Sequence, residues 1–186
     1  GTDLVASVKI GGLQDDGVNI KPKYSGTPGA QSINRNYGDD ARSEVIIDAA
    51  GSIYVASCTQ SDSFPTTPGA FQSASGGNLG NHQDGVVLKL KSDLSGVIFS
   101  TRIGGSNDDA AFVLAISPLT GDLYVGGTTA SNDFPGDKTG TISSSFNQGI
   151  CDGFVARFHN DGTFVKSTYI GTSGNDMLYG IQFDKF

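Results

Sequence analysis

The stretch Gly104-Gly-Ser-Asn-Asp-Asp-Ala110 returns later in the chain as Gly171-Thr-Ser-Gly-Asn-Asp-Met177, and a shorter form, Gly38-Asp-Asp-Ala41, comes before both. The spacings between these marks agree, because 110 − 41 = 69 and 177 − 110 = 67. A period of this length indicates one supersecondary unit that is used repeatedly. The repeat therefore decides the architecture more firmly than any single residue does.

Each repeat contains four strand-like runs. Turns that contain glycine separate the first run from the second and the third from the fourth, as in antiparallel hairpins. No stretch shows a helical period. The runs are Ser43–Asp48, Ser52–Thr59, Gly85–Lys91 and Gly96–Ile103 in one repeat, and Ala111–Ser117, Asp122–Thr129, Gly153–His159 and Thr163–Ile170 in the next.

Polarity along the runs predicts how they are layered. The first run of the later repeat is apolar on both faces, whereas its third run places Arg157 and His159 on one face and apolar residues on the other. The third run of the earlier repeat does the same with Lys89 and Lys91. Period two with one polar face marks a half-exposed strand, so burial should decline from the first strand to the fourth. Such a sheet is typical of a propeller blade. We expect near-complete burial of Phe112, Leu114, Ile116, Val125, Phe154 and Phe158.

The predicted fold class is therefore all-β, a partial propeller of two full four-stranded antiparallel blades with flanking partial blades. Residues 37–104 form one blade, 105–171 form the next, and 172–186 begin a further blade. Residues 1–36 depart from the pattern, although Ile10-Gly-Gly-Leu-Gln-Asp-Asp16 echoes the repeated mark. They are either a degenerate blade or a ring-closing segment. We expect one propeller domain that continues beyond this chain, which we interpret as a mature or trimmed piece of a longer protein.

A long connection joins the second and third runs of each repeat, and it carries recurring aromatic residues. Phe64 and Phe134 each precede a proline, and Phe71 and Phe146 follow alone. We expect these rings to fill the gap between neighbouring blades. The alternative is that they contact a ligand, because long loops in compact domains are often functional.

Composition excludes several classes of function. The formal net charge of −7 makes nucleic-acid binding unlikely, because a phosphate backbone would repel the surface. The longest apolar run, residues 110–116, is far shorter than the roughly 20 residues of a membrane-spanning helix, so we expect no direct membrane insertion. Cys58 and Cys151 stand at non-equivalent positions of different repeats, which favours two unpaired buried thiols over a disulfide.

Several elements recur in order and resemble the SBBP family of β-propeller repeats. They are the Gly-Gly-Ser-x-Asp-Asp mark, Tyr-Val in the second strand, the run from Ser63 to Gln72, Asp-Gly at the third strand and Ser-Thr-x-Ile-Gly at the fourth. The resemblance covers roughly residues 37–186. It implies a secreted or cell-surface bacterial protein, similar near its C-terminus to gliding-motility-associated surface proteins of the Bacteroidota that the type IX system exports. The expected location is extracellular or the outer cell surface. The family offers no catalytic residues to carry over.

Paired acidic residues are the strongest candidate for chemistry. They precede the innermost strand of successive blades and should form an arc around one mouth of the central channel. Asp side chains in turns commonly accept backbone hydrogen bonds, which is a structural role. Hard cations also prefer oxygen ligands, so calcium is the one cofactor considered. The candidate calcium ligands are Asp39, Asp40, Asp108, Asp109 and Asp176.

Two functions are consistent with these observations. The first is a non-catalytic scaffold, adhesion or ligand-binding module, whose partners are the remaining blades of the same polypeptide and a surface glycan or protein. The second is a fragment of a propeller enzyme, such as a glycoside hydrolase, with its active site at the channel mouth. Every blade has the same acidic pair, which favours the first. No nucleophile elbow, phosphate-binding loop or dinucleotide fingerprint occurs, and His82 and His159 lie in no metal-binding pattern.

Overall fold

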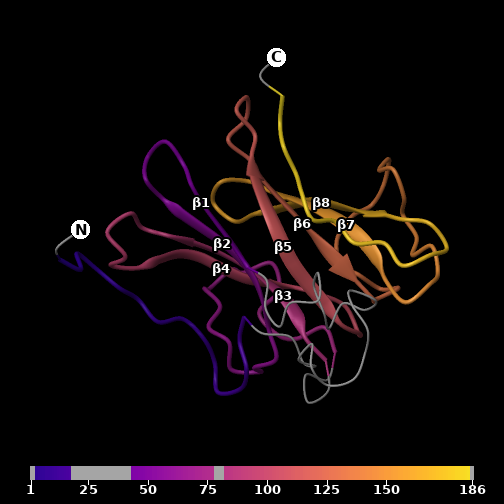
Figure 1. The fold of residues 1–186 in the computed structure, drawn as a ribbon, viewed down its shortest axis with the longest axis horizontal. Helices are drawn as coiled ribbons and strands as arrows, with labels where there is room; N and C mark the ends of the chain where they lie inside the picture. Colours follow the sequence, from indigo (N-terminus) through magenta and orange to yellow (C-terminus); the bar gives the residue numbers. More distant parts are fainter. Residues whose placement is uncertain (1–2, 18–42, 78–81, 185–186) are drawn as a thin grey trace.

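The computed structural model describes residues 3–17, 43–77 and 82–184 as two four-stranded antiparallel sheets that pack against one another (Figure 1). The strands pair in chain order within each sheet, β1-β2-β3-β4 and β5-β6-β7-β8. No helix occurs within these ranges, and therefore none there could cross a membrane. The first sheet contains β1 (Glu44–Ile47), β2 (Ile53–Thr59), β3 (Asp84–Leu90) and β4 (Val97–Ile103), and the second contains β5 (Asp109–Ile116), β6 (Leu123–Thr129), β7 (Asp152–Phe158) and β8 (Phe164–Ile170).

This arrangement confirms the all-β, four-stranded antiparallel part of the prediction. Every strand begins and ends within two residues of its predicted run. The turns follow the expected chemistry: between β1 and β2, the Gly51 N–H donates to Asp48 O over 2.9 Å, and Gly51 has a φ of 82°. A positive φ costs glycine little, so it suits this place in the hairpin. Two such sheets are compatible with two propeller blades.

The main core lies between the two sheets. It joins residues of β2, β3 and β4 to residues of β5, β6 and β7, so that the contact is face to face. The long connections contribute Phe71, Phe134 and Phe146 to it, as predicted: the ring of Phe71 stacks on Phe164 with centroids 4.0 Å apart, and Phe134 packs on Phe154 at 4.3 Å. Phe64 instead packs in a separate cluster and does not fill the gap between these two sheets. Its fully buried members include Tyr54, Ala56, Val87, Ile103, Ala111, Leu123, Val125, Phe134, Phe154, Ala156, Phe158 and Tyr169.

Three details of the predicted layering are wrong. Ile116 is only partly buried, unlike the other five residues named for the core. Burial does not decline from the first strand of the first sheet, because β1 is alternately exposed. Val45 at 59% and Ile47 at 66% lie on the face that a terminal blade is expected to leave without a neighbour, and among the described residues nothing covers it. Strand β3 is buried throughout, including Lys89, because the Lys89 ammonium reaches Asn160 of the second sheet. Burial therefore depends on which sheet lies alongside as well as on strand order.

Two separated segments of the chain pair with β2 along the same edge of the first sheet. Asp16 pairs with Thr59, and the Gly17 N–H donates to Cys58 O over 2.8 Å. Pairing resumes where Glu44 opposes Ala56. In the second sheet, β5 covers the equivalent positions without interruption, since Asp109 opposes Thr129. The intervening residues 18–42 lie outside the described ranges, and so do the mark at 38–41 and the predicted ligands Asp39 and Asp40.

Candidate functional site

The repeated acidic mark forms a tight turn at the junction between the sheets. Asp109 Oδ2 accepts the Gly105 N–H over 2.7 Å and the Ser131 hydroxyl over 2.8 Å. The same carboxylate-to-backbone bond recurs at Asp176, which accepts the Thr172 N–H over 2.7 Å. The turn after the fourth strand of each sheet is thus closed by its own aspartate, and the turn after β4 leads into β5.

The two adjacent carboxylates of the mark face different surroundings. Asp109 is fully buried, whereas the Asp108 side chain is 16% exposed. Asp108 Oδ1 accepts the Gln83 N–H over 3.2 Å and lies 3.3 Å from Nδ1 of His82. Asp176 lies in the separate turn that follows β8. The predicted ligands in the described chain therefore do not share one site.

A second buried carboxylate accompanies Asp109, and the sequence reasoning missed it. A side-chain carbon at Gly104 would lie 2.4 Å from Asp84 Oδ1 and 2.9 Å from Asp109 Oδ2, so both carboxylates converge on the same glycine. Asp84 is 1% exposed. Any side chain at Gly104 would collide with this pair. The recurrence of Asp-Gly at the start of both third strands was the signal that could have identified it.

The turn after β8 repeats the pair. A side-chain carbon at Gly171 would lie 2.4 Å from Asp152 Oδ1 and 3.1 Å from Asp176 Oδ2. Asp152 Oδ2 accepts the Asn147 N–H over 2.6 Å. The pairing of a third-strand aspartate with the aspartate of the following mark is therefore a property of the repeat.

Burial raises the pKa of both acids at the first junction. Desolvation raises the pKa of Asp84 to about 6, although Ser75, Arg102 and the Gly76 backbone act to lower it. Desolvation also raises the pKa of Asp109 well above its ordinary value. Each acid of this pair therefore binds its proton more tightly than a solvent-exposed carboxyl group does. A raised carboxyl pKa is found in catalytic sites and in buried structural clusters alike.

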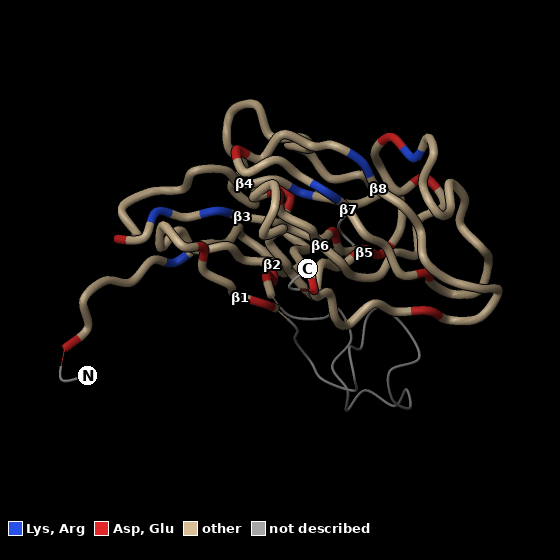
Figure 2. Tube along the Cα trace, turned by 90° about the horizontal axis from the view of Figure 1, so that it is seen from above, with Lys and Arg blue, Asp and Glu red and all other residues tan. Residues whose placement is uncertain are grey.

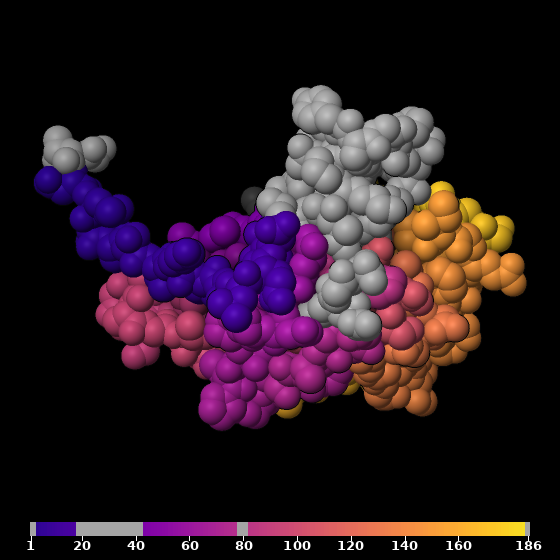
Figure 3. Space-filling view, turned by 90° about the horizontal axis from the view of Figure 1, so that it is seen from below, coloured from indigo at the N-terminus to yellow at the C-terminus, as the bar shows by residue number. Residues whose placement is uncertain are grey.

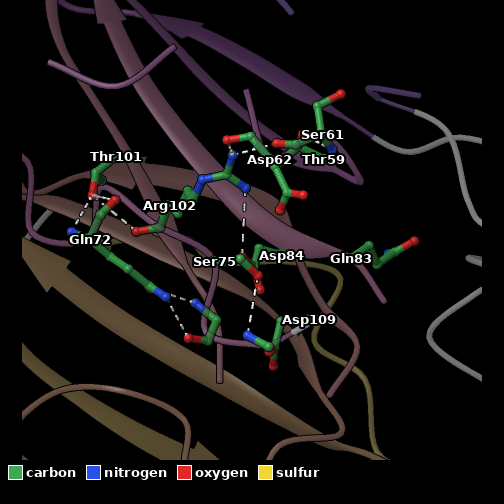
Figure 4. Close-up of polar contacts among 12 residues, drawn as sticks. Thr59, Ser61, Asp62, Gln72, Ser75, Gln83, Asp84, Thr101, Arg102 and Asp109 are labelled. Atoms are coloured by element: carbon green, nitrogen blue, oxygen red, sulfur yellow. Dashed lines mark hydrogen bonds and ion pairs between the residues drawn. The ribbon is translucent and has the colours of Figure 1, made fainter. Parts of the chain in front are cut away.

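Arg102 organises the polar cluster around Asp84 (Figure 4). Its guanidinium is fully buried, and Nη1 lies 3.7 Å from Asp84 Oδ2. Its Nη2 donates to the carbonyls of Ser61 and Asp62. The guanidinium thus connects the outermost strand to the start of the long connection, and it supplies positive charge beside one acid of the pair.

The acid pairs alone do not form an evident metal centre. Within 3–17, 43–77 and 82–184, no group of three or more His, Cys, Asp or Glu side chains could hold a metal ion. Cys58 and Cys151 are buried thiols that are not joined in a disulfide, as predicted. Acidic and basic residues are otherwise scattered over the loops and strands of both sheets (Figure 2). What the pairs can do chemically is share a proton and accept hydrogen bonds.

A hollow of about 770 Å³ lies away from the acid pairs, where β5, β6 and the segment 181–184 meet. Tyr124 packs edge-on against Phe183, with ring centroids 5.0 Å apart, and the Arg157 guanidinium lies 5.7 Å from the Tyr124 ring. Arg157 Nε also donates to Asp122 over 2.8 Å, and the hydrogen bonds of Asp122 with His159 and with Arg157 lower the Asp122 pKa. The hollow therefore combines aromatic faces with a partly exposed cation.

In comparisons with known proteins, no protein-family model and no curated protein matches the chain.

Proposed function

We propose that this chain is a non-catalytic segment of a secreted or cell-surface β-propeller of the SBBP type, acting as a scaffold, adhesion or ligand-binding module. The observation that carries this proposal is the burial of the acid pair Asp84 and Asp109 at the junction between the two sheets. Asp84 and Asp109 are at most 1% exposed, and Asp109 accepts hydrogen bonds from its own turn. Carboxylates in that position hold neighbouring blades together and are shielded from a substrate.

Further blades of the same polypeptide are the proposed partners. In the first sheet, the Tyr54 hydroxyl donates to Asn160 Oδ1 of the second sheet over 3.2 Å, and Lys89 reaches the same residue. Tyr124 and Arg157 occupy the equivalent positions of the second sheet and line the hollow. The hollow thus presents the same kinds of side chain that, in the first sheet, bind the β7–β8 turn, and it is suited to bind the equivalent turn of a neighbouring blade.

A propeller enzyme is the second candidate, and one observation favours it. Neighbouring carboxyls with a raised pKa, such as Asp84 and Asp109, are typical of acid–base catalysis. The paired geometry recurs at Asp152 and Asp176, however, and a catalytic pair needs two groups with different roles. Repetition favours the structural role.

One experiment separates these functions. The protein would be screened on a glycan array and assayed in parallel for hydrolysis of the glycans and of chromogenic glycosides. The proposal predicts no turnover, with or without glycan binding. Turnover that is lost in Asp84→Asn, with the fold retained by circular dichroism, would establish the enzyme and refute the scaffold.

Calcium is tested separately by calorimetric titration of the metal-free protein. The structural role of the Asp residues predicts no micromolar binding of calcium. Micromolar binding that disappears in Asp108→Asn/Asp109→Asn would make this a calcium-stabilised protein. Because Asp109 is buried, Asp108→Asn alone serves as the variant that keeps the turn intact.

A further inference from the structure

The segment Leu4–Ile10 has the sequence of an outermost strand. The stretches 4–12, 97–105 and 164–172 read Leu-Val-Ala-Ser-Val-Lys-Ile-Gly-Gly, Val-Ile-Phe-Ser-Thr-Arg-Ile-Gly-Gly and Phe-Val-Lys-Ser-Thr-Tyr-Ile-Gly-Thr. They align without a gap and share Ser, Ile and Gly at the same places. The second and third of these stretches contain β4 and β8, the fourth strands of their sheets.

The turn that follows this segment has the geometry of the turns that follow β4 and β8. Asp16 Oδ2 accepts the Gly12 N–H over 2.7 Å, the length found at Asp109 and Asp176. The Gln14 N–H donates to Ser61 Oγ over 2.8 Å, as the Asn107 N–H does to Ser131 Oγ over 2.9 Å. The segment and its turn therefore have the same position relative to the first sheet as β4 and its turn have relative to the second sheet.

The segment nevertheless has no strand partner within the described part of the chain. It extends along and beyond the first sheet (Figures 1 and 3), and residues 3–9 are exposed. Leu4 is 81% and Val5 is 98% exposed, whereas Phe99 and Ile103 of β4 are 5% and 0%. Only Ile10 at its end packs into a core, against Phe64, Val86 and Leu88. An apolar strand with a free edge is a template for pairing.

The acid pair gives a second, independent indication of the partner. A side-chain carbon at Gly11 would lie 2.8 Å from Asp16 Oδ2, which corresponds to Asp109 at Gly104 and Asp176 at Gly171. At Gly104 and Gly171 the first residue of the neighbouring third strand supplies the other carboxylate. At Gly11 the described residues supply Asp16 alone.

We infer that residues 4–10 are the fourth strand of a sheet whose other three strands come from another part of the same polypeptide, and that the third of these strands begins with Asp. This inference rests on the proposed stacking of blades. Gly85 opposes Ile103 and Gly153 opposes Ile170, so a small residue after that Asp should oppose Ile10. A second copy of the described chain does not fit this role, because the equivalent edges of β3 and β7 already pair with β4 and β8.

The test uses the complete natural polypeptide with the photo-cross-linking residue benzoylphenylalanine in place of Val8. A matched control carries it in place of Leu119, which is also exposed but lies in the turn between β5 and β6. Thr101 and Thr168 oppose Val87 and Val155, each three residues after the Asp. Mass spectrometry should therefore locate the Val8 cross-link about three residues after an Asp that begins a third strand, and the control should not reach that strand.

Hydrogen exchange gives the second measurement without a substitution. The amides of residues 4–10 should exchange at least about 100-fold more slowly in the complete polypeptide than in the isolated 186-residue chain. Unprotected amides, or cross-links from Val8 to β4 or β8 of a second copy, would overturn the inference. Neither outcome would alter the glycan and hydrolysis results, so failure here is distinguishable from failure of the proposed function.

Discussion

The two sheets use different side chains to connect the fourth strand to the long connection between the second and third strands. In the first sheet, the buried guanidinium of Arg102 donates to Ser61 O and lies beside Asp84. In the second sheet, Tyr169 stands at the equivalent place, and its hydroxyl donates to Ser131 O over 2.9 Å while accepting the Phe134 N–H over 3.0 Å. The repeat thus preserves a link from the fourth strand to the long connection, and either a charged or a neutral group can form it.

The sheets also differ in what lies against them. The face of the first sheet that carries Tyr54 and Lys89 is covered by the second sheet, whereas Tyr124 and Arg157 border a hollow. Equivalent residues of the repeat therefore lie at the junction between the sheets in one case and at the surface in the other. Variants at paired positions measure what the junction contributes.

The largest effect should come from Phe154→Ala. Phe154 is fully buried between the sheets and contacts Phe134, so truncation should lower the free energy of unfolding by about 3–5 kcal/mol. Val86 is the equivalent residue of the first sheet and lies outside the shared core, and Val86→Ala should cost roughly 1.5 kcal/mol because it removes less apolar volume. Urea unfolding measures both. Equal losses would contradict the assignment of the junction.

Arg102→Met should cost about 3–4 kcal/mol, because it removes one partner of a buried ion pair and leaves the Ser61 and Asp62 carbonyls unbonded. Arg102→Tyr introduces the side chain of the second sheet and should recover part of that loss. Urea unfolding of the two variants compares charged and neutral links directly. If tyrosine were no better than methionine, the two links would not be interchangeable.

Asp84 should make stability depend on pH between about 4 and 7. Its pKa is raised to about 6 in the folded protein, so the folded state binds the proton more tightly than the unfolded state does. The stabilisation from this tighter proton binding is fully present below the Asp84 pKa of the unfolded chain. It is lost as the pH rises through the Asp84 pKa of the folded protein, which lowers the free energy of unfolding by roughly 2–3 kcal/mol. Asp84→Asn should flatten this fall. Chemical unfolding at several pH values measures it, and an unchanged slope in the variant would refute the assignment.

The strands could be predicted from the sequence because their signals are local. Alternating polarity and glycine-containing turns place each strand within two residues of its observed bounds. The burial of Lys89 was missed because it depends on Asn160, 71 residues away in the other sheet. The polarity of Lys89 therefore predicted a solvent-exposed face of β3, where in the structure the neighbouring sheet provides a polar partner.

The acid pair could be only half predicted for a similar reason. Asp109 drew attention as part of the repeated mark, while Asp84 opens a strand and reaches Asp109 only through the packing around Gly104. The inner strand of the first sheet is a further case. The turn with the repeated aspartate lies at Gly12 to Asp16, but 25 residues separate Gly17 from Ser43 in the chain. A search for a regular repeat length could not reveal this interruption.

The smallest effect should distinguish Tyr54→Phe from Tyr124→Phe. The Tyr54 hydroxyl has Asp48 Oδ2 at 3.1 Å and Asn160 Oδ1 at 3.2 Å as acceptors for its one proton, so its removal should cost about 1 kcal/mol. The Tyr124 ring contacts Phe183 and Arg157 through its faces and edge, and phenylalanine keeps both contacts. Tyr124→Phe should therefore change stability by less than about 0.5 kcal/mol in the isolated chain.

In the complete polypeptide, where the proposal places a further blade against Tyr124, the same substitution should cost as much as Tyr54→Phe. Thermal unfolding of both variants in both contexts measures the difference, and a Tyr124 effect that stays near zero in the complete polypeptide would count against a blade seated in the hollow.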